Sequence, residues 1–189
     1  MNVGVDPDAI TVLVALFEAK GTLEYGEEVT QLEHALQCAT LAERSGADDA
    51  LVTAALLHDV GHMVHRDAQS TFEAGIDDCH ERLGARYLQR WFAPAVTQPV
   101  ALHVEAKRYL VTCDPDYWNT LSAVSRRSLQ LQGGVMSAGE ARDFSQQQGA
   151  IQALALRRWD DQAKTAGLSS APLEYFLERA RRCLKSDQS

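Results

Sequence analysis

A histidine and an aspartate stand side by side in the most apolar stretch of this chain, within the segment Leu56-Leu57-His58-Asp59-Val60-Gly61-His62. Burying two such side chains among leucines and alanines is costly unless a partner compensates them. His58 also belongs to a set of histidines that recur at intervals of roughly twenty to twenty-five residues: His34, His58, His80 and His103. The pattern favours a fold that gathers several separate segments around one buried polar site.

Hydrophobic residues recur at helical spacing along the chain, and valine and isoleucine never alternate with polar residues over a strand's length. The segment 30–46 is typical, because its apolar side chains form one stripe and Thr30 with Glu33 matches a capping box. We therefore predict an all-α protein, a helical bundle, with helices over residues 8–21, 30–46, 48–60, 75–92, 95–106, 122–131, 138–147, 150–166 and 172–185.

Two segments break the helical pattern. Residues 108–120 are rich in aromatics and contain Asp114-Pro115-Asp116, so an irregular loop is predicted there, and residues 131–136 predict a turn. Neither segment has the composition of a linker, and the chain shows no internal repeat. A length of 189 residues suits one domain with a substantial core, so we expect a single domain over residues 1–189.

Charge and composition exclude several classes of partner. The chain has 18 basic against 26 acidic residues, a net charge of −8, which disfavours binding to nucleic acid or to an anionic membrane. No apolar run approaches the ~20 residues that span a bilayer, and the first residues lack signal-peptide features, so a cytoplasmic location is expected. The four cysteines are scattered and are expected to be reduced packing residues. The sequence leaves the oligomeric state open.

The histidines and acids have the chemistry of metal ligands. On one predicted helix, His58 and His62 lie one turn apart with Asp59 beside them, and the other histidines come from neighbouring helices. Imidazole and carboxylate ligands without thiolates suit iron, manganese or magnesium better than structural zinc. More than four such ligands indicate two metal ions, which Asp59 is suited to bridge.

Other interpretations remain open for individual residues. A histidine on a helix is often exposed or simply hydrogen bonded, which is how we interpret His65, and one of Asp160 and Asp161 is expected to be a surface charge. Lys107 and Arg157, together with His62, have the chemistry to clamp a phosphate or phosphonate against the metals. Solvated surface charges are the alternative for these two cations.

The ordered set of candidate ligands resembles the HD-domain superfamily, whose members share a helical bundle and a mononuclear or dinuclear metal centre. More narrowly, residues 29–34, 54–62, 128–134 and 157–164 look like the 2-amino-1-hydroxyethylphosphonate dioxygenase branch. The resemblance covers roughly residues 8–166, which we take as the motif-bearing core, and leaves out the predicted C-terminal helix over 172–185.

The resemblance implies two iron ions in a mixed-valence Fe(II)/Fe(III) pair, with O2 as co-substrate. It places one iron on His34, His58, Asp59 and Asp160, and the other on Asp59, His80 and His103. Asp160 is preferred to Asp161 because it lies four residues before Lys164, as the family's ligand does. The phosphonate of the substrate would be received by His62, Lys107, Ser125 and Arg157.

By the same resemblance, the enzyme cleaves the C–P bond of a 1-hydroxy-2-(trimethylammonio or amino)ethylphosphonate and releases phosphate with glycine betaine or glycine. The family has a gating tyrosine three residues before a glutamate that contacts the substrate amine. Here Glu27 keeps the family's spacing to His34, but Tyr25 is only two residues before it and Glu24 takes the tyrosine's place. Tyr25 with Tyr109 and Trp118 would offer aromatic faces to a methylated ammonium group, whereas loop packing is the alternative.

Two other functions compete with the oxygenase. An HD-type metal-dependent phosphohydrolase would use most of the same ligands to direct a metal-bound water at a phosphate ester. A regulatory HD module without catalysis would have lost ligands, whereas all six are present here. Oxygen demand separates the first alternative from the oxygenase, because hydrolysis consumes no O2.

Overall fold

The computed structural model describes residues 8–24, 28–65 and 74–186, and over these residues the fold is helical with no strand, which confirms the all-α prediction. Two isolated β-bridges, Glu24 with Thr30 and Phe92 with Leu184, join loop segments. The helices are α1 (Ala9–Lys20), α2 (Gln31–Arg44), α3 (Asp49–Leu57), α4 (Val60–Val64), α6 (His80–Leu88), α7 (Pro94–Cys113), α8 (Tyr117–Thr120), α9 (Ala123–Leu131), α10 (Ala138–Ser145), α11 (Ala150–Gln162) and α12 (Leu173–Arg182).

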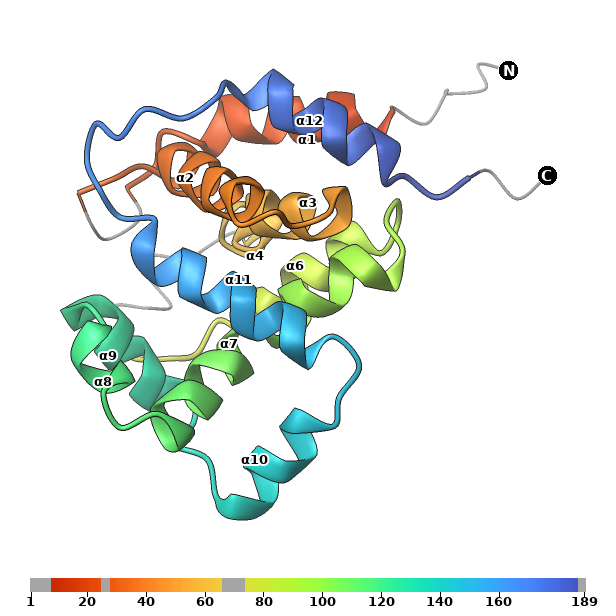
Figure 1. Cartoon of the computed structure of the whole chain (residues 1–189). Coiled ribbons are helices and arrows are strands. Elements are labelled where there is room, and N and C mark those ends of the chain that lie inside the picture. Colours follow the sequence, from red (N-terminus) through yellow and green to blue (C-terminus); the bar gives the residue numbers. More distant parts are fainter. Residues whose placement is uncertain (1–7, 25–27, 66–73, 187–189) are drawn as a thin grey trace.

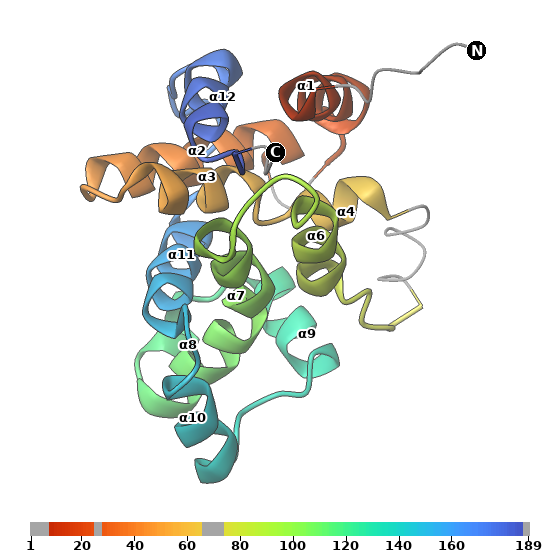
Figure 2. The same ribbon diagram turned by 90° about the vertical axis from the view of Figure 1, so that its right-hand side faces the viewer.

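The helices form a bundle around α2, α3, α7 and α11 (Figure 1). Helices α1 and α12 cover one end of this group, and α8, α9 and α10 lie at the other end, as the turned view also shows (Figure 2). The main apolar core joins residues such as Phe17 of α1, Leu57 of α3, Leu156 of α11 and Phe176 of α12. None of the helices in the described parts of the chain is both long and apolar enough to cross a bilayer.

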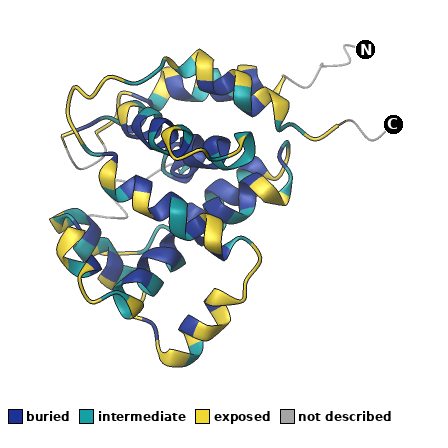
Figure 3. Ribbon diagram, in the orientation of Figure 1, coloured by how far each residue is buried: buried dark blue, intermediate teal, exposed yellow. Residues whose placement is uncertain are grey.

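The interior of the bundle contains polar side chains as well as apolar ones. Burial follows the inward faces of the central helices, while α10 and α12 keep exposed outer faces (Figure 3). The residues predicted to bind metal are among the most deeply buried in the protein, since His34 and His58 are 0% exposed and His103 and Asp160 are 1% exposed. Such burial requires partners, and these partners define the site described below.

The prediction of one helix over residues 48–60 is wrong, because this segment forms two helices. Helix α3 ends at Leu57, α4 starts at Val60, and His58 and Asp59 occupy the turn between them. The His58 ring donates from Nδ1 to the carbonyl oxygen of Ala55 at 2.8 Å, and an uninterrupted helix would use that oxygen to accept the amide of Asp59. The His58 side chain therefore helps to end the helix.

The predicted helix over residues 75–92 begins five residues later than expected, at His80. The side chains of Asp77 and Asp78 accept hydrogen bonds from the backbone amides of Cys79 and His80, at 3.2 and 3.3 Å. Aspartates that bind nearby amides in this way compete with helix formation. Cys79 itself has a left-handed backbone with φ of 50°.

The predicted loop over residues 108–120 is also wrong, because α7 continues to Cys113 and α8 follows at Tyr117. Tertiary contacts extend the helix: Leu110 is 4% exposed within a small core cluster that includes Tyr117, and Arg108 donates from Nε to the carbonyl oxygen of Gly134 at 2.9 Å. Tyr109 packs against a phenylalanine of α10. Packing thus overrides the local aromatic and proline signals.

The cysteines are free thiols, as predicted, but they do not all have the packing role expected of them. Cys38 is buried, Cys183 is partly buried, and Cys79 and Cys113 are exposed. The packing interpretation holds for Cys38 and is wrong for the two exposed residues.

Candidate metal centre

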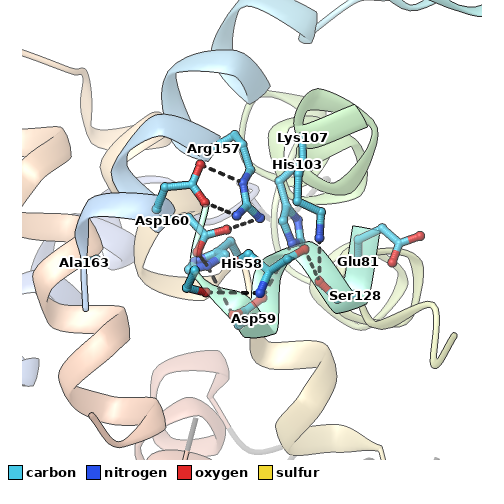
Figure 4. Close-up of polar contacts among 12 residues, drawn as sticks. His58, Asp59, Glu81, His103, Lys107, Ser128, Arg157, Asp160 and Ala163 are labelled. Carbon is cyan, nitrogen blue, oxygen red and sulfur yellow. Dashed lines mark hydrogen bonds and ion pairs between the residues drawn. The ribbon is translucent and has the colours of Figure 1, made fainter. Parts of the chain in front are cut away.

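Five structural elements bring the six predicted ligands to one place. His34 comes from α2, His58 and Asp59 from the turn after α3, His80 from the start of α6, His103 from α7 and Asp160 from α11. The close-up shows the side chains of His58, Asp59, His103 and Asp160 directed toward a common centre (Figure 4). The structure therefore gathers all the residues that the sequence singled out as metal ligands.

The ligand-type atoms divide into two groups, each sharing the carboxylate of Asp59. In the first group, the Nε2 atoms of His34 and His58 are 3.2 Å apart, and Asp59 Oδ2 is 3.3 Å from His58 Nε2. Asp160 Oδ1 completes this group at 3.4 Å from His34 Nε2. The two oxygens of Asp59 thus face different sets of imidazoles, as the second group shows.

In the second group, the Nε2 atoms of His80 and His103 are 3.1 Å apart. Asp59 Oδ1 lies 3.4 Å from His80 Nε2 and 3.5 Å from His103 Nε2. Asp59 is therefore placed between two pairs of histidines and can serve both pairs at once.

The second ring nitrogen of each histidine is anchored, which fixes how the ring faces the centre. The Nδ1 atoms of His34, His58 and His103 donate to the carbonyl oxygens of Ala163, Ala55 and Val100 at 2.8, 2.8 and 2.7 Å. His80 Nδ1 donates to Asp78 Oδ1 at 2.9 Å. A neutral imidazole that donates from Nδ1 has a lone pair on Nε2, the atom used for metal binding.

The distances between the ligand-type atoms are those expected around bound metal ions. Four Nε2 lone pairs meet at short range, and Asp59 Oδ2 is buried with no hydrogen-bond partner among the residues that the structure describes. Ligand bonds of about 2.0 to 2.2 Å place neighbouring ligand atoms about 3 to 3.5 Å apart, close to the separations found here. A cation in each group would satisfy atoms that otherwise repel one another or lack a partner.

A cavity of about 510 Å³ opens onto the centre and has a strongly basic wall. Two lysines on this wall hydrogen bond to serines of α9. Lys107 Nζ donates to Ser128 Oγ at 2.8 Å, and Lys164 Nζ donates to Ser125 Oγ at 2.9 Å. Burial, followed by the nearby Arg157, lowers the pKa of Lys107 to about 7. The sequence interpretation included Lys107 and Ser125 but missed Lys164 and Ser128, although the two serines lie one turn apart on one helix.

Arg157 links the basic wall to the metal centre. Its Nη1 is 2.6 Å from Asp160 Oδ2 (Figure 4). Its Nε and Nη2 hydrogen bond to Asp161, which also accepts from the hydroxyl of Tyr117. Burial raises the pKa of Asp160, but Arg157 outweighs it and holds that pKa well below its usual range. The expectation that Asp160 or Asp161 is a surface charge is wrong, because their side chains are only 2% and 7% exposed.

His62 lies beside the centre. The prediction that it shares a helix face with His58 is wrong, because His58 precedes α4 and His62 lies within it. Its ring stacks on that of His80 with centroids 3.9 Å apart, and its Nδ1 is 2.8 Å from Asp78 Oδ2. Asp78 also binds His80, so one carboxylate contacts both rings. The sequence interpretation missed Asp78, although its position two residues before His80 was a usable signal.

A glycine makes this close stacking possible. A Cβ atom at Gly61 would lie 1.9 Å from the carbonyl oxygen of His80, and one at Gly84 would lie 3.0 Å from the amide nitrogen of Gly61. Helices α4 and α6 therefore approach each other through these two glycines. Any side chain at residue 61 would separate His62 from His80.

Three further predictions concern residues around the cavity. Tyr25 and Glu27, assigned by resemblance to the gate and to the substrate amine, lie outside the described residues. Tyr109 packs on Phe144, and Trp118 lies beneath the guanidinium of Arg126 at 5.3 Å, so neither lines the cavity. Packing is therefore the correct interpretation for Tyr109 and Trp118, although they pack from helices α7 and α8 and not from a loop, and their proposed role as an ammonium-binding surface is wrong.

Comparison with known proteins agrees with the geometry. The family model described as "HD domain" matches residues 32–130, more than half of the chain and the part that contains His34, His58, Asp59, His80 and His103. Hydroxymethylphosphonate dioxygenase of Gimesia maris is 46% identical over 180 residues, which cover 94% of this chain and 89% of that protein.

The matches to two other relatives cover nearly as much of this chain. The [1-hydroxy-2-(trimethylamino)ethyl]phosphonate dioxygenase (glycine-betaine-forming) of Leisingera caerulea is 38% identical over 88% of this chain and 86% of its own length. Uncharacterized protein L432 of Acanthamoeba polyphaga mimivirus is 37% identical over 88% of this chain and 78% of its own length. The match to the HD model and to two named dioxygenases covers nearly the whole sequence. The chain therefore belongs to the HD-domain phosphonate dioxygenase family, and it is a metal-dependent oxygenase.

Proposed function

We propose that this protein uses a pair of iron ions and O2 to cleave the C–P bond of a 1-hydroxyphosphonate, releasing phosphate and a carboxylic acid. The observation that carries the proposal is the meeting of four imidazole Nε2 atoms around Asp59 at the edge of a cavity with a basic wall. The names of the two relatives support the same reaction class.

The proposed ligands are those of the two groups around Asp59. One iron would be held by His34, His58, Asp59 and Asp160, and the other by Asp59, His80 and His103. The absence of any cysteine from these groups favours iron over structural zinc. A mixed-valence Fe(II)/Fe(III) pair is the state that we propose for catalysis, and bound iron would supply the activation of O2.

The basic wall is the proposed site of the phosphonate. Lys107 is 2% exposed and, within the described residues, pairs with no carboxylate, so an anion from solution would compensate its charge. Arg157 and Ser125 lie on the same wall, and His62 lines the cavity nearby. The family resemblance implies these same four residues as phosphonate ligands, and Lys164 and Ser128 extend the set of donors.

The reaction balances without a further co-reactant. A 1-hydroxyphosphonate and O2 yield a carboxylate and inorganic phosphate: the C–H and C–P bonds break, one oxygen atom joins the carbon, and the other joins phosphorus. The protein's residues would hold the phosphonate and direct C1 toward the bound metals. Bound iron would supply the redox chemistry, and the side chains would orient the substrate toward it.

The remainder of the cavity is the proposed site of the group on C2. The described lining includes the acids Glu24 and Asp77 with the aliphatic side chains of Leu23 and Ile76. An acidic and aliphatic surface suits an amino or trimethylammonio group, so the proposed products are glycine or glycine betaine. The kcat/KM values for the amino substrate, the trimethylammonio substrate and hydroxymethylphosphonate test this point. A preference for hydroxymethylphosphonate would remove the ammonium group from the proposal.

The proposed reaction is tested by aerobic incubation of the iron-loaded protein with 1-hydroxy-2-aminoethylphosphonate, its trimethylammonio analogue and hydroxymethylphosphonate. We expect phosphate release matched by an equal uptake of O2, and no phosphate under argon. An ordinary phosphate ester serves as the control for hydrolysis. Phosphate release from that ester under argon, without any oxygen-dependent product, would favour the phosphohydrolase instead.

Lys107 predicts how substrate binding depends on pH. Its pKa of about 7 means that the ammonium form, which attracts the phosphonate, is lost as the pH rises above 7. We expect KM to rise on the order of tenfold between pH 7 and pH 8.5, because a single ionisation removes the positive charge. In Lys107→Arg the guanidinium stays charged, so the increase should disappear. An unchanged rise of KM in that variant would contradict the role of Lys107.

A further inference from the structure

We infer that Asp78 is a positioning residue that holds His62 and His80 in one fixed arrangement and so links the substrate cavity to one of the proposed metal positions. The inference deepens the proposed function and rests on it. Asp78 Oδ2 accepts from His62 Nδ1 at 2.8 Å, and Asp78 Oδ1 accepts from His80 Nδ1 at 2.9 Å. Each oxygen of one carboxylate thus fixes a different imidazole.

These two hydrogen bonds decide which ring nitrogen remains available. With Nδ1 bound to Asp78, His80 presents Nε2 toward Asp59 at 3.4 Å, where the metal is proposed. His62 lines the cavity, and Nε2 is likewise the nitrogen that its contact with Asp78 leaves for a bound molecule. A carboxylate partner fixes both the tautomer and the orientation of an imidazole. Here a single carboxylate does so for two rings of different function.

The backbone around Asp78 is shaped for this contact. Asp78 lies two residues before His80, outside α6, and its Oδ1 also accepts the backbone amide of His80 at 3.3 Å. The intervening Cys79 has φ of 50° and, among the residues the structure describes, is the one non-glycine residue with a left-handed backbone. Such a backbone costs free energy in a residue with a side chain and is often retained at functional sites. The turn brings the Asp78 carboxylate back to the Nδ1 edge of the His80 ring.

A second, independent feature holds the same pair of rings together. Helices α4 and α6 lie side by side (Figure 2), and the absence of a side chain at Gly61 lets the neighbouring His62 stack on His80 with an interplanar angle of 20°. The strained turn and the glycine contact thus both favour the arrangement that Asp78 binds. If Asp78 only filled space, neither the strained turn nor the glycine contact would be needed to hold the two rings beside it.

Replacing Asp78 by asparagine separates this role from simple packing. The two histidines contact different oxygens of the carboxylate, and asparagine replaces one of these oxygens by an NH2 group that only donates, so in this geometry the amide accepts Nδ1–H from one histidine but not from both. The other ring must move its proton to Nε2 or rotate away. If that ring is His80, the nitrogen proposed to bind metal becomes protonated. Asp77→Asn is the matched control for the histidine tautomers and for iron affinity, but not for KM, because Asp77 lines the part of the cavity proposed for the group on C2. It removes the same charge one residue away, and the Asp77 carboxylate accepts from the amide and the thiol of Cys79.

The first measurement is the tautomer of each histidine by nitrogen-15 NMR in the metal-free protein, which needs neither substrate nor activity. We expect the Nδ1–H form for both His62 and His80 in the wild type and in Asp77→Asn, and a change in at least one ring in Asp78→Asn. An Nε2–H form of either ring in the wild type would overturn the inference, even if Asp78→Asn does not fold.

The second measurement is iron affinity together with steady-state kinetics. For Asp78→Asn we expect iron affinity to fall about 10- to 100-fold, as for other residues that support metal ligands, and KM for the phosphonate to rise as well. Asp77→Asn should retain the wild-type iron affinity. Unchanged iron affinity and KM in a folded Asp78→Asn would overturn the inference. Failure of the C–P cleavage assay in the wild type would instead count against the proposed function and leave the NMR result standing.

Discussion

Replacing Asp59 by alanine is expected to abolish iron binding at both positions and to lower kcat/KM at least about 1000-fold, because metal catalysis supplies several kcal/mol and every 1.4 kcal/mol is a factor of ten. The physical reason is the position of the carboxylate, whose two oxygens face the His34–His58 group and the His80–His103 group separately. Iron content per chain and oxygen-dependent phosphate release are the two measurements.

Single-histidine variants make this prediction sharper. His103→Ala removes a ligand from one group only, so it should weaken one iron and leave the other, whereas Asp59→Ala should lose both. Asp143→Ala, an exposed acid on α10, is the control for the loss of a carboxylate and should retain the wild-type iron content. Retention of two irons by Asp59→Ala would show that Asp59 does not bridge them.

Replacing Arg157 by leucine should destabilise the metal-free protein by about 3 to 5 kcal/mol, because it leaves two buried carboxylates without their cation. Arg157 is 4% exposed and pairs with both Asp160 and Asp161. For a chain of this length each kcal/mol corresponds to a Tm change of about 2 to 4 °C, so a decrease of roughly 10 °C is expected. Thermal unfolding monitored by circular dichroism measures it.

The adjacent arginine offers a matched control. The Arg158 side chain is 51% exposed and approaches Asp114 at 3.7 Å, so Arg158→Ala should change stability by less than about 0.5 kcal/mol. Arg157→Leu should also raise KM for the phosphonate, whereas Arg158→Ala should not. Equal Tm values for the two variants would mean that Arg157 is not the cation that compensates Asp160 and Asp161.

The helical class and the set of converging ligands were predictable from the sequence for definite reasons. Helical spacing of apolar residues is a strong signal over long segments, and it correctly located α2 and α11 to within a few residues. The His58–Asp59 pair stood out because ionisable groups in an apolar segment need partners. The resemblance to the HD superfamily added Asp160, which composition and spacing alone did not separate from Asp161.

Two of the wrong helix boundaries have a common physical cause, which is that side chains compete with the local helical pattern. The break at His58 arises from a ring that takes a backbone carbonyl oxygen, and the late start of α6 arises from aspartates that bind backbone amides. Neither the break nor the late start changes the spacing of hydrophobic residues, so the sequence pattern predicted continuous helix at both places. Asp161 was misjudged for a related reason: its spacing of four residues from Arg157 was visible, but its burial depends on α8 and Tyr117.

The most direct test of the dinuclear centre is anomalous X-ray diffraction at the iron edge from crystals of the iron-loaded protein. The account predicts two iron peaks about 3.5 to 4 Å apart, with one oxygen of Asp59 directed to each. A single peak, or two peaks with His80 and His103 turned away from both, would contradict it.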